Sequence, residues 1–180
     1  MTSPDPAETR CIQAAIGGDE SAFRQLLHRH HGVVRSLMQR MSGNAATADD
    51  LAQETFLVAW QKMEGFRGGS FRSWLCTIAC RLYYRQARHE GRSELSEDLD
   101  PPDAMAREPG PQIDLDRAIA MLPATQRRAL LLSAMAEMSH AEIAGVTGWP
   151  LGTVKSHIAR AKAALRRNLE GYADDDTDRT

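Results

Sequence analysis

Hydrophobic side chains recur along the chain at three- and four-residue steps, whereas strand-like alternation of polar and apolar positions does not persist anywhere. Such steps place apolar residues on one face of an α-helix. In the first half of the chain they predict helices at residues 12–16 and 23–41, a third from Thr47 and a fourth from Phe71. We expect an all-α fold, in which the inward face of the third helix consists of Leu51, Phe56, Leu57, Trp60 and Met63.

A change of composition divides the chain in two. Residues 93–112 hold four prolines among acidic and small residues, with almost no large apolar side chain, which is typical of an extended linker. We therefore expect two small helical domains joined by an acidic, proline-rich linker. The expected limits are 10–92 for the first domain, 93–112 for the linker, 113–170 for the second domain and 171–180 for an acidic tail.

The second domain carries the signature of a helix-turn-helix. Ser139 and Glu142 have the spacing of a capping box, which opens a short helix, and Gly148 can end that helix in a left-handed conformation. A longer helix follows, from Gly152 to about Leu169, and it is rich in lysine and arginine. Such a helix can enter the major groove of DNA, where hydroxyls bond phosphates and long cations reach base edges. An ordinary helical hairpin with a basic surface remains the alternative on this pattern. The candidate DNA contacts are Thr153, Lys155, Ser156, His157 and Arg160.

The total charge of the chain conceals the separation of basic and acidic residues into different segments. With 22 basic and 24 acidic residues the formal net charge is −2, which by itself disfavours a nucleic-acid partner. However, residues 67–92 hold six arginines against one glutamate, and residues 151–170 hold five cations against one glutamate. Eight acids against one arginine lie between them, at residues 93–116. Two basic blocks are thus available for DNA, although solvated helix faces would explain charge runs equally well.

The first domain offers two further candidate surfaces. Asp50, Gln53 and Glu54 share one helix face and form an acidic patch suited to a basic partner. The glycine-rich loop at residues 65–70 and the arginines that follow could hold a displaced DNA strand, with an aromatic ring beside the loop stacking on a flipped base. Phe71 and Trp74 are favoured as core residues, and solvated helix faces remain the alternative for both patches. The candidate strand-binding residues are Phe66, Arg67, Arg72, Arg81, Arg85 and Arg88.

Several classes of protein are disfavoured. No run of about 18 apolar residues is available for a membrane span, and the N-terminal residues lack the apolar region of a secretory signal. Three cysteines fit a reducing cytoplasm better than a disulfide scaffold. Cys76 and Cys80 lie one helical turn apart, but two ligands do not close a zinc site. Because no catalytic triad, phosphate-binding loop or carboxylate pair is recognisable, we expect no enzyme activity, no metal and no cofactor.

Two sets of motifs, one in each expected domain, resemble the extracytoplasmic-function (ECF) sigma factors. In the second domain they are LPATQR at residues 122–127 and AEIAGVTGWPLGTVKSHIARA at residues 141–161. In the first domain they are DLAQETF at residues 50–56 and FRSWLCTIA at residues 71–79. The resemblance covers roughly residues 10–170 in the order and spacing of that family, which makes it more specific than a lone helix-turn-helix.

The resemblance implies a cytoplasmic specificity subunit of bacterial RNA polymerase that directs promoter-specific transcription initiation, for a stress or envelope response. It implies that the first domain binds core polymerase through Asp50, Gln53 and Glu54, and recognises and melts the minus-ten promoter element. It also implies that the helix-turn-helix reads the minus-thirty-five element, and that a cognate anti-sigma factor controls the protein. A sigma mimic that titrates an anti-sigma factor, and an autonomous DNA-binding regulator, are the alternatives.

Three residues depart from the family pattern. Arg81 and Arg85 stand where the family often has asparagine and aspartate, and His157 stands where it commonly has arginine. The arginines make the expected strand-binding face more basic than usual. A DNA contact made by His157 would depend on its charge near neutral pH. The base-level roles of these three residues therefore do not transfer from the family.

Overall fold

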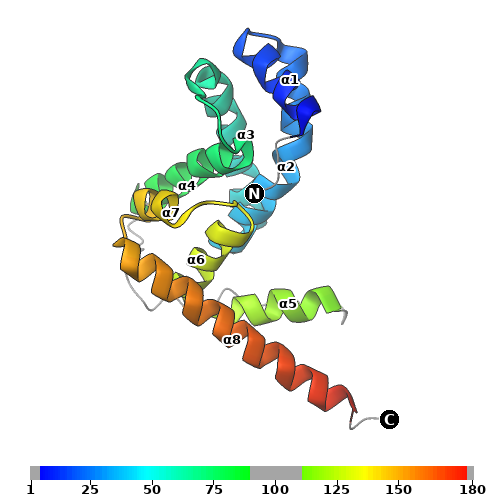
Figure 1. Ribbon diagram of the computed structural model, residues 1–180, viewed down its shortest axis with the longest axis vertical. Helices are drawn as coiled ribbons and strands as arrows, with labels where there is room; N and C mark the ends of the chain where they lie inside the picture. Colours follow the sequence, from blue (N-terminus) through cyan, green and yellow to red (C-terminus); the bar gives the residue numbers. More distant parts are fainter. Residues whose placement is uncertain (1–4, 90–110, 178–180) are drawn as a thin grey trace. The chain divides into compact units, whose positions relative to one another are not determined.

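The computed structural model describes residues 5–89 and 111–177, with side chains placed for residues 5–89 and 115–167. All regular elements in these ranges are helices, so the all-α prediction is confirmed (Figure 1). The described residues form two compact units. The first consists of residues 5–89 and the short segment Met135–Glu137, and the second consists of the rest. Within this part of the chain, no helix combines the length and the apolar character that crossing a membrane requires.

The first unit is built around three helices that pack against one another, α2 (Glu20–Ser42), α3 (Ala45–Gln61) and α4 (Phe71–His89). A shorter helix, α1 (Pro6–Ile16), packs against α2 and against the 3-10 turn η1 (Met63–Gly65). The helices enclose an apolar core whose most deeply buried large side chains are at most 2% exposed, as expected for aliphatic residues that drive folding. They include Leu26, Leu37, Met38, Leu51 and Leu75.

Local capping sets the ends of α2 and α3. The Asp19 carboxylate accepts hydrogen bonds from two backbone amides of the first turn of α2, and Gly43 ends that helix at a φ of 69°. The Asn44 side chain then caps α3 by accepting from the Thr47 amide at 3.0 Å. Because an N-cap residue precedes its helix by one position, α3 begins at Ala45 rather than at Thr47 as the sequence pattern predicts.

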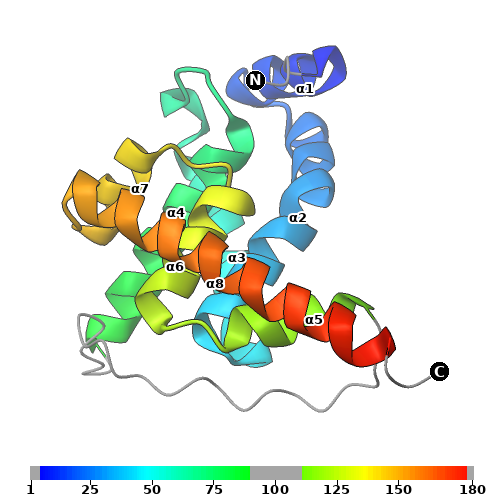
Figure 2. The ribbon, with the colours of Figure 1, turned by 60° about the horizontal axis from the view of Figure 1, so that its bottom comes forward.

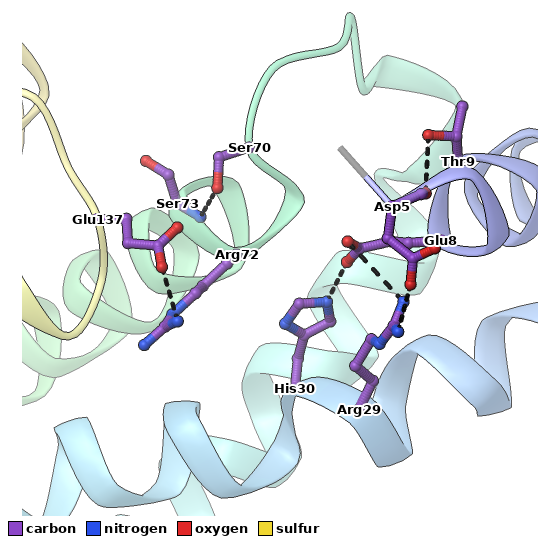
Figure 3. A network of polar contacts seen from close by, with 9 residues as sticks. All are labelled: Asp5, Glu8, Thr9, Arg29, His30, Ser70, Arg72, Ser73 and Glu137. Carbon is purple, nitrogen blue, oxygen red and sulfur yellow. Dashed lines mark hydrogen bonds and ion pairs between the residues drawn. The ribbon is translucent and has the colours of Figure 1, made fainter. Parts of the chain in front are cut away.

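Polar contacts join α1 to α2 (Figure 3). Asp5 contacts Arg29 at 2.5 Å, and Glu8 contacts Nε2 of His30 at 2.5 Å. The pKa of Asp5 is lowered, first by the hydrogen bond that its carboxylate accepts from the Ala7 amide and then by Arg29. The same carboxylate caps α1, so one side chain both starts this helix and ties it to α2.

The second unit contains α5 (Pro111–Ala120), α6 (Ala124–Ala134), α7 (His140–Thr147) and α8 (Leu151–Thr177). The long helix α8 packs against the other three, and Figure 2 shows it crossing α6. A small core lies among these helices. Its side chains, each at most 4% exposed, include Leu122, Leu131, Leu132, Ile143 and Val154.

Helix boundaries in the second unit differ from those predicted. Helix α5 begins at Pro111, two residues before the expected start of the second domain, and residues 93–110 of the expected linker lie outside the described residues. Helix α6 ends at Ala134 rather than near Met138. Helix α8 continues to Thr177 rather than ending near Leu169, because no proline interrupts it and a single helical glycine costs only about 1 kcal/mol.

Candidate nucleic-acid and protein interfaces

The acidic patch expected on α3 is present as one exposed helix face. Asp50 and Gln53 are exposed, and the Glu54 side chain is 45% exposed. Residues three and four apart are neighbours on a helix surface, so the three polar side chains lie side by side. Leu57, predicted to point inward, is instead 65% exposed. It lies about 100° around the helix from buried Phe56, so packing Phe56 into the core turns Leu57 outward.

One member of this patch pairs with the basic face of the neighbouring helix. The Glu54 carboxylate contacts the guanidinium of Arg85 on α4 at 2.5 Å. The Arg85 side chain is 56% exposed, so the pair lies at the surface and contributes little to stability. The sequence assigns these two residues to different surfaces, one for protein and one for DNA. Their contact was not predicted, and it depends on the arginine at position 85.

The remaining arginines of the expected strand-binding set lie on α4 and on the loop before it. Arg81 and Arg88 are exposed, seven residues and about two turns apart, on the same side of α4 as Arg85. Arg67 is exposed in the loop and donates a hydrogen bond to the Glu64 carbonyl at 2.6 Å. Arg72 is half-buried and donates to Glu137 at 2.8 Å (Figure 3). One cationic row on α4 therefore consists of Arg81, Arg85 and Arg88. Arg72 does not belong to this row.

Phe66 must be removed from the set of candidate DNA contacts. Its ring is 7% exposed and packs edge-on against the rings of Phe71, at 5.5 Å, and Trp74, at 5.3 Å. A ring enclosed by two others cannot stack on a base without leaving the core. The sequence missed this because an aromatic residue in a glycine-rich loop gives no periodic signal. Immediately after the loop, the Ser70 hydroxyl accepts a hydrogen bond from the Ser73 amide and so caps α4 (Figure 3).

The cysteines of α4 belong to the core. Cys76 and Cys80 are fully buried. Burial raises the pKa of Cys76 to about 12 and that of Cys80 well above its usual value, because desolvation disfavours the thiolate. Metals are bound by thiolates, so this environment opposes ligation. The described residues contain no group of histidine, cysteine or acidic side chains arranged to hold a metal ion.

The helix-turn-helix predicted in the second unit is formed by α7 and α8. Ser139 and Glu142 make both hydrogen bonds of the capping box, at 3.2 Å and 2.8 Å. Gly148 ends α7 with a φ of 76°, and its amide donates to the Ala144 carbonyl. Buried Ile143 of α7 and Val154 of α8 belong to the core of this unit. The first helix of the motif thus braces the second, as in DNA-binding proteins of this type.

The outward side of α8 has small side chains at its centre and cations at its edges. Gly152, Ser156 and Ala159 follow one another opposite the buried stripe, while Lys155 and Arg160 are exposed on the two sides of this line. Small residues let a helix approach DNA closely, and the flanking cations can reach phosphates or base edges. Of the five predicted contacts, Lys155 and Arg160 are thus the best placed.

The three other predicted contacts of α8 are half-buried. The Ser156 hydroxyl donates to the Thr153 carbonyl at 2.9 Å, so it is already engaged within the helix. The His157 ring packs edge-on against the Trp149 ring, with centroids 5.2 Å apart. His157 is thereby turned toward the chain segment that joins α7 to α8. This contact between the turn and the recognition helix was not predicted from the sequence.

Comparison with known proteins matches both units. A family model for sigma-70 region 2 covers residues 26–93, and one for sigma-70 region 4 covers residues 112–165. The chain is 32% identical to the ECF RNA polymerase sigma factor SigE of Mycolicibacterium smegmatis, over 95% of this chain and 71% of that protein. It is 35% identical to the ECF RNA polymerase sigma factor SigM of Mycobacterium tuberculosis, over 92% and 86% of the two chains.

Solved structures agree with these matches. The sigma factor RpoE of Bartonella quintana, in complex with the anti-sigma factor NepR, has a TM-score of 0.61 at 30% identity, over 82% of this chain and 96% of that chain. CnrH in complex with the cytosolic domain of CnrY has a TM-score of 0.61 at 26% identity, over 92% and 98%. The resemblance drawn from the motifs is confirmed. With a region 2 match on the first unit and a region 4 match on the helix-turn-helix unit, this chain belongs to the extracytoplasmic-function RNA polymerase sigma factors.

Proposed function

We propose that this chain binds core RNA polymerase as a dissociable specificity subunit and directs promoter-specific transcription initiation. The observation that carries the proposal is the outward side of α8, where small residues lie between Lys155 and Arg160 on a braced helix-turn-helix. The names of the relatives, which are RNA polymerase sigma factors, support it. The chain acts by binding and positioning, and RNA synthesis is the chemistry of the polymerase.

In this proposal α8 reads the minus-thirty-five element. Replacing Lys155 or Arg160 with alanine is expected to weaken binding of holoenzyme to promoter DNA. The logarithm of the promoter-binding constant falls linearly with the logarithm of the salt concentration, and loss of one phosphate contact makes that slope shallower by about 0.9. Loss of a base contact instead reduces the free energy that discriminates between promoter variants by about 1–3 kcal/mol. Arg117→Ala, an exposed cation on α5, serves as the control. Equal affinity and equal salt slope for all three variants would contradict this role for α8.

The acidic face of α3 is the proposed docking surface for polymerase. Asp50→Arg reverses one exposed charge of that face and should strongly reduce retention of core polymerase by the tagged protein. Glu64→Arg makes the same charge change at an exposed position in η1 and should bind as the wild type does. Because both sites are exposed, thermal unfolding should shift little, within about 0.5 kcal/mol. Equal binding by both variants would remove this surface from the proposal.

The cationic row on α4 is the proposed contact for the separated minus-ten strand. Arg81 and Arg88 can pair with phosphates, whereas Arg85 between them is engaged by Glu54. Separating one or two base pairs costs only a few kcal/mol. Permanganate footprinting of thymines in an open promoter complex tests this. Arg81→Ala with Arg88→Ala should reduce strand opening more than it reduces binding to a promoter that is already mismatched around minus ten.

Regulation is proposed from the structural relatives. One solved neighbour is a sigma factor in complex with an anti-sigma factor, and another is in complex with the cytosolic domain of a second protein. We therefore propose a cognate anti-sigma factor, a stress-type response and a cytoplasmic site of action for this chain. Run-off transcription with purified core polymerase and genomic promoter fragments separates the alternatives. A sigma mimic binds polymerase or an anti-sigma factor without initiating, and an autonomous regulator binds promoter DNA without polymerase.

A further inference from the structure

One large apolar side chain of the first unit is not covered. Leu57 is 65% exposed and is the exposed large hydrophobic residue among residues 5–89, where the other bulky aliphatic side chains are buried or half-buried. A single exposed leucine is common on protein surfaces and by itself indicates nothing. Its position on the helix is what carries the inference.

Leu57 lies within the acidic face of α3. It follows Gln53 and Glu54 by four and three residues and Asp50 by seven, the spacings that bring side chains together along one side of a helix. At about 100° per residue, Leu57 lies between Gln53 and Asp50 around the helix axis. Gln61, one turn further on, is also exposed. An apolar side chain is therefore surrounded by polar and acidic ones.

This arrangement matches the anatomy of a protein–protein contact. Binding energy concentrates in a few apolar side chains that become fully desolvated, while surrounding polar groups exclude water and set orientation. Exposed charges such as Asp50 steer and select a partner but add little affinity on their own. An acidic face without an apolar centre would bind weakly at physiological salt, and Leu57 supplies such a centre.

We propose that Leu57 is the apolar anchor of the surface through which this chain docks on RNA polymerase. The partner is a basic segment of the polymerase with an apolar side chain that covers Leu57 while its cations face Asp50 and Glu54. Charge complementarity with the acidic surroundings selects this partner over a second copy of the chain, whose own α3 face would be repelled. The inference rests on the proposed function and adds the residue that provides its affinity.

The test measures the affinity of full-length protein for purified core polymerase, without DNA, at two salt concentrations. Leu57→Ala should weaken binding about tenfold at both, because loss of apolar burial is not screened by salt. Asp50→Arg should have an effect that shrinks at the higher salt. Leu57→Met keeps the volume and the apolar character and should retain most of the affinity.

Leu151→Ala is the matched control. Leu151 is 46% exposed at the start of α8, so the same truncation is made on a helix of the other unit, and binding to polymerase alone should not change. All three leucine variants should unfold at the same temperature as the wild type, since an exposed side chain contributes little to the core.

Two results would overturn the inference while the proposed function stands. In the first, Leu57→Ala binds polymerase as tightly as the wild type although Asp50→Arg does not. In the second, sedimentation shows that the wild type forms a dimer that Leu57→Ala loses, which would assign this side chain to a second copy. If the wild type itself does not bind core polymerase, the proposed function fails first, and the role of Leu57 falls with it.

Discussion

Replacing either of two glycines in the helix-turn-helix with alanine should change the stability of the second unit in opposite directions. Gly148 ends α7 at a φ of 76°, whereas Gly145 lies within α7. A Cβ atom at either position would meet no heavy atom within 4 Å. Steric clash is therefore excluded at both sites, and only the conformation of the backbone distinguishes them.

The expected magnitudes follow from that conformation. A left-handed backbone costs an alanine about 1–2 kcal/mol, part of which is offset by about 0.4–1 kcal/mol of lost freedom in the unfolded chain. Gly148→Ala should thus destabilise α7 and α8 by roughly 1 kcal/mol. Gly145→Ala replaces a helical glycine and should stabilise them by up to about 1 kcal/mol. The two variants should differ by about 2 kcal/mol.

Hydrogen exchange of the full-length protein provides the assay. Peptides from α7 and α8 report the opening free energy of the second unit, and peptides from α4 provide an internal reference that should not change. Gly148→Asn is a further control, because asparagine tolerates the left-handed region and should recover part of the loss. If both alanine variants shifted exchange in the same direction, the backbone conformation assigned to Gly148 would be refuted.

Three further predictions concern the first unit. Tyr83→Phe removes the hydrogen bond that the buried hydroxyl donates to the Met41 carbonyl at 2.9 Å, and should lower the free energy of unfolding in urea by about 1–3 kcal/mol; an unchanged midpoint would contradict that bond. A thiol reagent at pH 8 should label Cys11 in the folded protein and all three cysteines in urea, because Cys76 and Cys80 are buried; native labelling of three thiols would contradict their burial. The pKa of Cys76 rises from 9.0 to about 12 on folding, so the unfolded state loses the thiol proton at a lower pH than the folded state does. The free energy of unfolding should therefore fall as the pH rises from about 9 to 12. Cys76→Ala should reduce this dependence on pH, measured by urea titrations at alkaline pH.

The departures from the family pattern acquire a physical meaning only in the folded chain. Arg85 was expected to serve DNA, but its guanidinium contacts Glu54 of the proposed docking face. Arg81 remains exposed and available to a phosphate. The sequence identified both as unusual, yet it could not say which of them meets a carboxylate, because residues 54 and 85 are brought together only by the packing of α3 against α4.

What the sequence determined by itself were features that depend on neighbours along the chain. The capping box at Ser139 and Glu142, the left-handed end of α7 at Gly148 and the all-helical character follow from interactions over four residues or fewer, so they can be read directly. The tertiary structure decided which side of a helix faces inward where apolar residues cover a wide arc. Phe66 is buried and Leu57 is exposed because the core has room for only some of the apolar side chains, and the packing of the helices determines which of them enter it.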